Sequence, residues 1–316
     1  MTKKHLPFLL LALAALGALP FFLSGYWARV LTVMFMYGVI AQGINLMSGF
    51  MGYVPFGNAM FFAVGGYSTA VAMGAGIPFF LTLPVAACVS VAISVLIGLP
   101  VLRLRGHYFA VATIGVSGAL MSVVQNVEFT GGAMGTTLPI LNASPAQASV
   151  FFYLAMLGLL VVANTVTHLI LRSRFGFGIR AIRANEDAAN SMGINTTLYK
   201  VLNWSISAVL TSLAGSFYAY WMSFISPDEM FNVMIAVNAI VILLVGGLGT
   251  VLGPMVGAVI FQFVSEVAWS SFGHYHLAVL GVATIIIVAL IPNGFVGRFL
   301  ELRRKRITGQ TEEGAR

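Results

Sequence analysis

Residues able to do chemistry are few in this sequence, and they form no catalytic arrangement. The lysines Lys3, Lys4, Lys200 and Lys305 all lie outside any G-x-x-x-x-G-K-[ST] loop, the motif that binds the phosphates of a nucleotide. The metalloprotease motif H-E-x-x-H and the serine-hydrolase motif G-x-S-x-G are also absent. We therefore expect no enzyme activity, no hydrolysis of ATP by this chain, no cofactor and no metal site.

Neutral polar side chains within apolar stretches offer a different chemistry, the passage of a solute. Uncharged amides can line a path for a zwitterion without trapping it, although hydrogen bonding between helices is the simpler role for several of them. The amides considered for a path are Gln42, Asn45 and Asn58, with Gln125, Asn126, Asn203 and Asn238 as further polar positions.

Ionisable groups that could serve as a proton relay are nearly absent from the apolar stretches. A proton-driven transporter usually buries such a group in the middle of a span. Only Glu266 and His168 come close, each toward the end of an apolar stretch. A snorkelling or hydrogen-bonded side chain is the favoured interpretation of both, with a relay as the alternative.

The distribution of charge indicates which elements hold these residues. The chain is 59% apolar and 8% charged, and residues 30–102 contain no Asp, Glu, Lys or Arg. A water-soluble domain does not need such a composition, so a lipid bilayer is the expected solvent. Since a crossing takes about 20 residues and must be helical, we expect ten spans, near residues 6–23, 30–48, 57–75, 80–101, 107–126, 150–171, 200–223, 231–246, 251–268 and 276–292.

The positive-inside rule gives the orientation of these spans. With Lys3 and Lys4 in the cytoplasm, Arg29 is the one residue among the 16 basic residues that falls outside. The expected fold is therefore an all-α, polytopic transmembrane bundle with both termini cytoplasmic, comprising a membrane domain over residues 1–300 and a basic, then polar tail over 301–316. The formal charge of +7 indicates contact with anionic lipid and no nucleic-acid partner.

Two glycine-rich segments interrupt the apolar pattern. Residues 48–58 contain three glycines and Pro55 but no charge, which is typical of backbone enclosed by protein or lining a cavity; a tight cytoplasmic loop is the alternative. Pro55 and Gly57 are therefore added to the candidates for the path. A second break at 246–254 sits near a similar position in the other half, which hints at an inverted five-plus-five repeat.

One sizeable polar segment, residues 172–200, is expected in the cytoplasm. Gly176 and Gly178 allow a turn, and Ile179 and Ile182 fall on a different side of a helix from Arg180 and Arg183. The segment is suited to docking on a soluble partner, with a solvated connecting loop as the alternative. Asn185 can cap a second helix that begins with Glu186 and Asp187 and ends at Gly193.

Small residues recur at four-residue spacing at Gly249, Gly253 and Gly257. Such spacing lets helices approach closely in lipid. Internal helix packing is the simple interpretation, and a face for a second membrane subunit is the alternative.

Five segments in a fixed order carry a family resemblance over most of the chain. The sequence resembles the membrane subunits of branched-chain amino acid ABC importers, in particular the M-type (LivM-type) permease. The matching segments are GYVPFGNAMFFAVGGY at 52–67, RGHYFAVAT at 105–113, TGGAMG at 130–135, SRFGFGIRAIRANEDAANSMGIN at 173–195 and GGLGTVLGPMVG at 246–257.

The resemblance implies partners and roles. It implies a second related permease subunit, two cytoplasmic ATP-binding subunits and an external substrate-binding protein, in the inner (plasma) membrane. It places Gly131 and Gly132 near the pathway and makes the 172–200 segment the coupling element. The residues then expected to couple to the ATPases are Arg180, Arg183, Asn185, Glu186, Asp187 and Gly193.

The solute is less well defined by the resemblance. Relatives often read S-L-G-H where this chain has Pro55, Phe56, Gly57 and Asn58, so a neutral amide replaces a titratable ring. Branched-chain or related amino acids are the expected cargo; urea, short amides or aromatic acids, or a stand-alone secondary transporter, are the alternatives.

Overall fold

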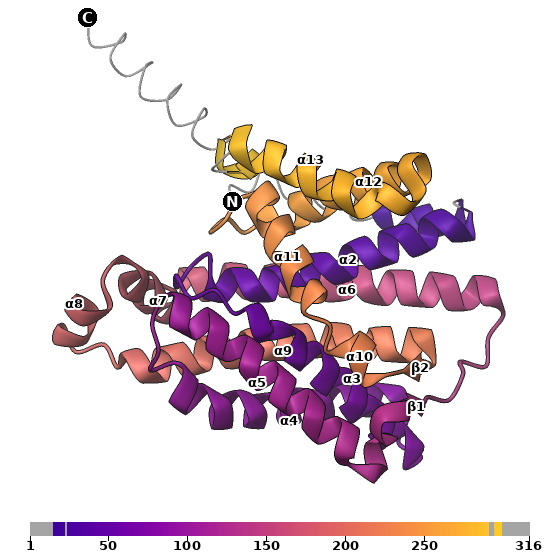
Figure 1. Cartoon of the computed structure of the whole chain (residues 1–316), viewed down its shortest axis with the longest axis horizontal. Helices are drawn as coiled ribbons and strands as arrows, with labels where there is room; N and C mark the ends of the chain where they lie inside the picture. Colours follow the sequence, from indigo (N-terminus) through magenta and orange to yellow (C-terminus); the bar gives the residue numbers. More distant parts are fainter. Residues whose placement is uncertain (1–14, 23, 291–293, 299–316) are drawn as a thin grey trace, which may run out of the picture.

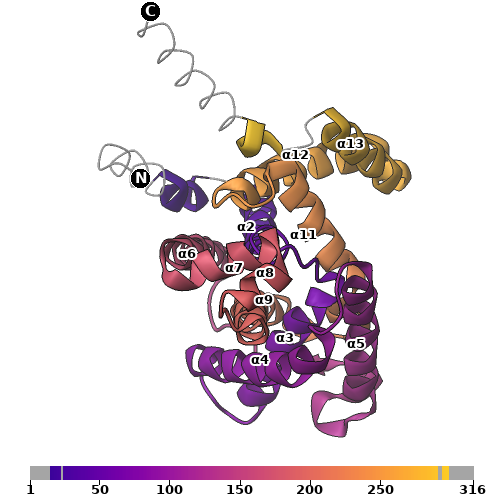
Figure 2. The same cartoon turned by 90° about the vertical axis from the view of Figure 1, so that its left-hand side faces the viewer.

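The computed structural model describes residues 15–22, 24–290 and 294–298, which form a bundle of helices (Figures 1 and 2). Nine of the ten expected spans coincide with a helix in this described part. The first, residues 6–23, lies mostly outside it, as do both chain ends and the tail 301–316. The nine helices are α2 (Gly25–Met47), α3 (Ala59–Gly74), α4 (Phe79–Val101), α5 (His107–Asn126), α6 (Pro145–Arg172), α9 (Thr196–Met222), α11 (Val233–Gly246), α12 (Gly253–Phe272) and α13 (His276–Leu290).

Five helical stretches among the described residues are long and apolar enough to cross a membrane. They are Gly25–Met47, Phe79–Val101, His107–Asn126, Pro145–Arg172 and Pro227–Gly246. Their composition agrees with a helical membrane protein. The number of ten spans and the cytoplasmic placement of the termini remain predictions.

The centre of the bundle is α9, which packs against α2, α3 and α4. Two glycines bring α3 and α9 into backbone contact. A Cβ atom added to Gly65 would lie 1.9 Å from the carbonyl oxygen of Ser212, and one added to Gly215 would lie 1.9 Å from that of Phe62. The Trp204 ring packs edge-on against Phe61 and Phe109, so aromatic side chains fill the space beside this contact.

The two ends of the bundle carry different short elements (Figure 1). At one end lie α7 (Arg174–Ala184) and α8 (Glu186–Ser191). At the other lie α10 (Pro227–Met230) and a two-stranded antiparallel pair of β1 (Thr136–Thr137) and β2 (Phe224–Ile225). This pair is a small exception to the all-α prediction.

The two glycine-rich breaks lie side by side. Asn45, near the end of α2, donates from Nδ2 to the carbonyl oxygen of Thr250 at 2.8 Å and accepts from the backbone N–H of Gly249 at 3.0 Å. Counterparts in an inverted repeat would lie at opposite faces of the membrane. The contact therefore gives no support to the idea that these two breaks are the inverted counterparts of each other.

Candidate functional site

The segment predicted to dock a soluble partner folds as α7 and α8, which lie in front of the other helices in the end-on view (Figure 2). Ser173 caps α7 by accepting from the backbone N–H of Gly176 at 3.3 Å. Ile179 and Ile182 are buried, whereas Arg180 and Arg183 lie on the exposed side. The predicted amphipathic pattern is confirmed.

The turn expected at Gly176 and Gly178 is wrong, because both residues lie inside α7. A Cβ at Gly176 would stand 2.2 Å from the carbonyl oxygen of Ile170, and one at Gly178 would stand 2.2 Å from the Tyr199 ring. These glycines are needed for close packing of α7 against the end of α6 and the start of α9.

The boundaries of α8 follow the predicted capping residues. Oδ1 of Asn185 accepts from the backbone N–H of Ala188 at 3.0 Å, and Glu186 and Asp187 form the first turn. Gly193 follows the helix with φ of +85°, a conformation that glycine adopts without strain.

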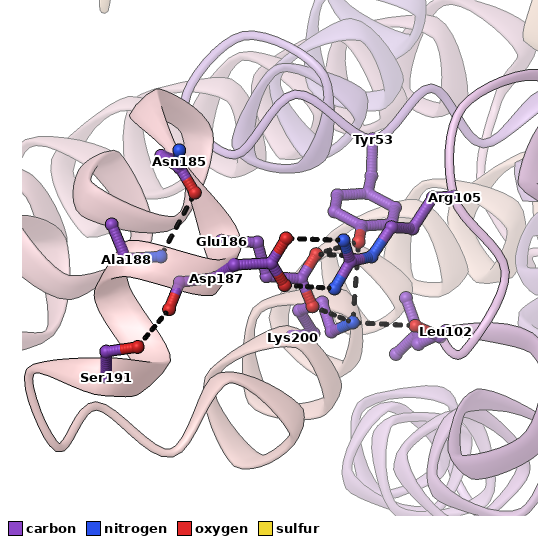
Figure 3. Close-up of polar contacts among 9 residues, drawn as sticks. All are labelled: Tyr53, Leu102, Arg105, Asn185, Glu186, Asp187, Ala188, Ser191 and Lys200. Carbon is purple, nitrogen blue, oxygen red and sulfur yellow. Dashed lines mark hydrogen bonds and ion pairs between the residues drawn. The ribbon is translucent and has the colours of Figure 1, made fainter.

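Glu186 turns back toward the membrane bundle (Figure 3). Its Oε1 lies 2.7 Å from Nζ of Lys200, and its Oε2 accepts a hydrogen bond from the Tyr53 hydroxyl. Lys200 is 4% exposed and donates a second hydrogen bond to the carbonyl oxygen of Leu102 at 2.7 Å. Glu186 therefore joins α8 to the first break, to the end of α4 and to the start of α9.

Asp187 and Arg105 form a second, more exposed link (Figure 3). Two guanidinium nitrogens of Arg105 donate to the two carboxylate oxygens of Asp187 at 2.8 and 3.1 Å, and Nε of Arg105 lies 3.6 Å from Glu186. This two-point geometry is the favourable one for an arginine and a carboxylate. It ties α8 to the loop between α4 and α5.

The charges of this network determine its protonation. Burial raises the pKa of Glu186, but hydrogen bonds from Lys200 and Tyr53 and the charges of Lys200 and Arg105 outweigh that effect, so the pKa lies below its ordinary value. The hydrogen bonds from Arg105 and its charge lower the pKa of Asp187. Burial, together with the hydrogen bond to Glu186, raises the pKa of the Tyr53 phenol. Both carboxyl groups are thus ionised at neutral pH.

The surface that α7 and α8 leave free is partly apolar. Phe177 is 65% exposed and Met192 is 85% exposed, and the guanidinium of Arg180 lies 4.7 Å above the Phe177 ring. Arg180 also donates to the carbonyl oxygens of Gly176 and Leu171. This surface is accessible to another protein, whereas the inward-facing carboxylate of Glu186 is not.

Arg183 connects α7 to both breaks. Its guanidinium donates to the carbonyl oxygen of Gly49. A Cβ at Gly249 would lie 2.9 Å from that same carbonyl oxygen and 3.0 Å from the Arg183 guanidinium. Gly249 lies in the turn before α12. The two breaks and α7 come together at this residue.

Most of the 48–58 segment is buried, although Gly52 is exposed. A Cβ at Gly57 would lie 1.9 Å from the carbonyl oxygen of Thr113, and the backbone N–H of Gly57 donates to Oγ1 of Thr113 at 3.1 Å. Pro55 and Asn58 are buried, and Nδ2 of Asn58 donates to Oγ1 of Thr211 at 2.8 Å.

In the part of the bundle that the structure describes, several amide and hydroxyl groups are buried without a partner, and they include two of the amides considered for a path. Gln42 is fully buried, and neither its Nε2 nor its Oε1 has a hydrogen-bond partner among the described residues. Oδ1 of Asn58 and Oγ of Ser207 are also unpaired within the described part of the chain. Such atoms are costly to bury unpaired.

The remaining predicted residues lie elsewhere. Gly131 and Gly132, with φ of +84° and +59°, form turns beyond the end of α5, away from the 48–58 segment. Gly253 begins α12, and a Cβ at Gly257 would lie 2.0 Å from the carbonyl oxygen of Ile242. Gly257 thus sits where α12 approaches α11, and the helix-packing prediction has a matching geometry at this position.

Three members of the ion network were not predicted from the sequence as site residues: Tyr53, Arg105 and Lys200. Arg105 was noted only as the first residue of the matching segment 105–113. A signal was present in Lys200, since a lysine that begins a long, mostly apolar stretch is expected to find a partner. No pattern in the sequence indicated that the partner is Glu186.

These features define a helical membrane protein with a polar helical segment tied to two internal breaks, and the comparisons identify its family. The chain belongs to the family of the branched-chain amino acid transport system permease component, which matches residues 26–288. No solved structure matches the chain.

Three relatives illustrate the similarity. The high-affinity branched-chain amino acid transport system permease protein LivM of Salmonella typhimurium is 30% identical over 93% of this chain and 76% of the relative. The permease protein LivH of the system of the same name in Escherichia coli K12 is 26% identical over 83% of this chain and 91% of the relative. The autoinducer 2 import system permease protein LsrC of Salmonella paratyphi B is 30% identical over 47% of this chain and 44% of the relative.

Proposed function

We propose that this chain is one of two related membrane subunits of an ATP-driven importer of branched-chain or related amino acids in the inner membrane. Two permease proteins of Escherichia coli K12 that carry the same system name, LivM and LivH, are both similar to this chain. This similarity supports pairing with a second, related permease.

The contact of Arg183 with Gly49 carries the proposal. The α7–α8 segment lies at the end of the bundle with Phe177 and Met192 exposed, and the same segment reaches the two breaks through Arg183. An ATPase that binds the exposed surface could therefore move the backbone at both breaks. Glu186, Asp187, Asn185 and Gly193 then hold α8 in place, and the direct contacts with the ATPase come from Phe177, Met192 and Arg180.

The path for the solute is proposed to run beside the 48–58 segment. Gln42, Asn45 and Asn58 are buried neutral amides there, and Pro55 and Gly57 shape the enclosed backbone. In alternating access the unpaired atoms of Gln42 and Asn58 would meet the solute or its water. An external binding protein would deliver the solute at the opposite end of the bundle, where Gly131 and Gly132 lie.

Reconstitution of the whole transporter tests the proposal. The chain, its sister permease and two ATPases are placed in proteoliposomes, and uptake of labelled leucine is measured with the external binding protein present. We expect uptake only with ATP, and none when the ATPases carry an inactivating substitution of the catalytic glutamate. Accumulation of leucine by the chain alone without ATP would instead establish a secondary transporter.

A further inference from the structure

A cavity of about 420 Å³ lies at the end of the bundle opposite α7 and α8. It is formed by the first turns of α2, the last turn of α9 and the middle of α12, and Arg29, Val30, Val33, Trp221, Gln262 and Glu266 are among the residues that line it. Its volume falls in the usual range for sites that bind small molecules. By the predicted topology, this end faces the outside.

The two charged residues that line the cavity both occupy unusual positions for charges in a membrane protein. Arg29 is the single basic residue that the positive-inside rule leaves on the outer side, and Glu266 is the acidic residue nearest to the middle of a span. A basic residue on the outer side and an acid within a span both run against the usual pattern of a membrane protein. Their meeting in one cavity gives both a common explanation.

The two charges are available to a ligand. Among the described residues, no ion pair or hydrogen bond joins Arg29 to Glu266, and the Arg29 guanidinium has no partner within the described part of the chain. Glu266 is oriented by a hydrogen bond from the Tyr26 hydroxyl to its Oε1. A free cation and an oriented carboxylate therefore line one small space.

The rest of the lining matches one kind of molecule. A guanidinium binds a carboxylate through paired hydrogen bonds, and a carboxylate binds an ammonium group. Val30, Val33, Met222 and the Trp221 ring offer apolar surface, and the Gln262 amide offers one donor and one acceptor group. An α-amino acid with an aliphatic side chain presents this same combination of carboxylate, ammonium and apolar group.

We propose that the Arg29–Glu266 cavity is an outer binding site for a zwitterionic, aliphatic amino acid, with Arg29 on its carboxylate and Glu266 on its ammonium group. The proposal rests on the proposed function and adds to it a site in the membrane subunit itself that selects the solute. A zwitterionic lipid headgroup also carries a separated anion and cation. It lacks an aliphatic group of the size of an amino-acid side chain next to these charges.

Direct binding to the assembled transporter tests this site. The complex of this chain with its sister permease and ATPases, without the external binding protein, is placed in phosphatidylglycerol nanodiscs, and binding of radiolabelled leucine is measured. We expect saturable binding of the labelled leucine. Unlabelled leucine should displace it at least about tenfold more effectively than leucinamide, which lacks the carboxylate, or 4-methylpentanoate, which lacks the ammonium group.

Matched variants assign each charge. Arg29→Gln should raise the Kd for leucine by roughly tenfold to a hundredfold and remove the preference for leucine over leucinamide. Glu266→Gln, whose side chain can still accept the bond from Tyr26, should remove the preference over 4-methylpentanoate. Arg29→Lys keeps the positive charge but loses the paired hydrogen bonds, so its Kd should lie between that of the original protein and that of Arg29→Gln. Glu128→Gln, an outer acid that does not line the cavity, should leave binding unchanged.

Each contrary result has a distinct meaning. Unchanged leucine affinity in both Arg29→Gln and Glu266→Gln, with the complexes intact by size exclusion and ATPase rate, would overturn the site. Absence of saturable leucine binding would overturn it too, as would loss of leucine binding when phosphatidylethanolamine is added, which would identify a lipid site. ATP-dependent leucine uptake by the same purified complex, moved into proteoliposomes with the external binding protein present, would then still support the proposed function, whereas absence of uptake would count against that function itself.

Discussion

The carboxylate of Glu186 lies 2.7 Å from the ammonium of Lys200, and Lys200 is 4% exposed. The pair joins the start of α9 to the α8 segment that is proposed to receive the motion of an ATPase. A buried ammonium with one carboxylate partner is stable only while that partner remains ionised.

Glu186→Gln should therefore destabilise the protein far more than Asp187→Asn. The first substitution leaves the charge of Lys200 buried without a counter-ion, which typically costs about 3 kcal/mol of unfolding free energy. The second removes an exposed pair, whose loss should change the unfolding free energy little because solvent screens it. Thermal unfolding of the two purified variants in detergent measures the difference, and equal losses would contradict the inward role of Glu186.

Acid should weaken the attachment of α8. The folded pKa of Glu186 and that of Asp187 both lie below their ordinary values of 4.5 and 3.8, so their stabilisation is complete above those values and is lost as the pH falls through the lower folded pKa values. The contribution of these two carboxyl groups to thermal stability, measured as the difference from the double variant that lacks both charges, should be constant from about pH 8 to about pH 5 and decline below about pH 4. The decline should be smaller in the double variant Glu186→Gln, Asp187→Asn, and an identical decline would refute the assignment.

An added methyl group should separate α3 from α9. In Gly65→Ala the new Cβ would lie 1.9 Å from the backbone oxygen of Ser212, so we expect a loss of several kcal/mol, on the order of 3, and little folded protein. Gly118→Ala on α5, where a Cβ meets nothing within 4 Å, is the matched control and should be neutral or slightly stabilising. Yields from size exclusion report the result.

Polar substitutions on the exposed surface of α7 and α8 should detach the ATPases. Phe177→Ser and Met192→Ser remove side chains that are 65% and 85% exposed, so folding is preserved while an apolar contact is lost. Co-purification of the ATPases should fall at least about tenfold in the double variant. Met134→Ser, 89% exposed at the other end of the bundle, is the control; full retention of the ATPases by the double variant would place the docking surface elsewhere.

Arg183→Gln should uncouple the ATPases without releasing them. The substitution removes the bond to the carbonyl oxygen of Gly49 and leaves Phe177 and Met192 in place. We expect ATP hydrolysis to continue while leucine uptake per ATP falls roughly tenfold, as for loss of a charged hydrogen bond. Arg174→Gln, at the exposed start of α7, is the comparison. If both variants transport normally, Arg183 does not carry the motion.

The parts of the fold that were predictable are those set by local sequence. Apolar runs of sufficient length predicted the nine long helices seen in the described part of the chain, and Asn185 and Gly193 marked the ends of α8, because capping depends only on neighbouring residues. Gly176 and Gly178 were misjudged because their role depends on packing against Ile170 and Tyr199.

The partners within the site could not be predicted, because they come together only in three dimensions. Tyr53 and Glu186 are 133 residues apart, and Asn45 and Thr250 are 205 residues apart. The sequence alone does not show whether Glu186 pairs with Lys200 or contacts an ATPase. The same holds for Arg29 and Glu266, which were visible in the sequence as separate exceptions.

The backbone contact at Gly65 and Gly215 limits how this subunit can change shape. Because backbone carbonyl groups occupy the space of side chains at both glycines, we expect α3 and α9 to move together as one rigid body. Changes of shape would then occur at the two glycine-rich breaks, residues 48–58 and 246–254. Hydrogen bonds from Asn45 and Arg183 hold these breaks close together. We therefore expect the two breaks to act as a single hinge, so that replacing a glycine in either one should stop the movement of both.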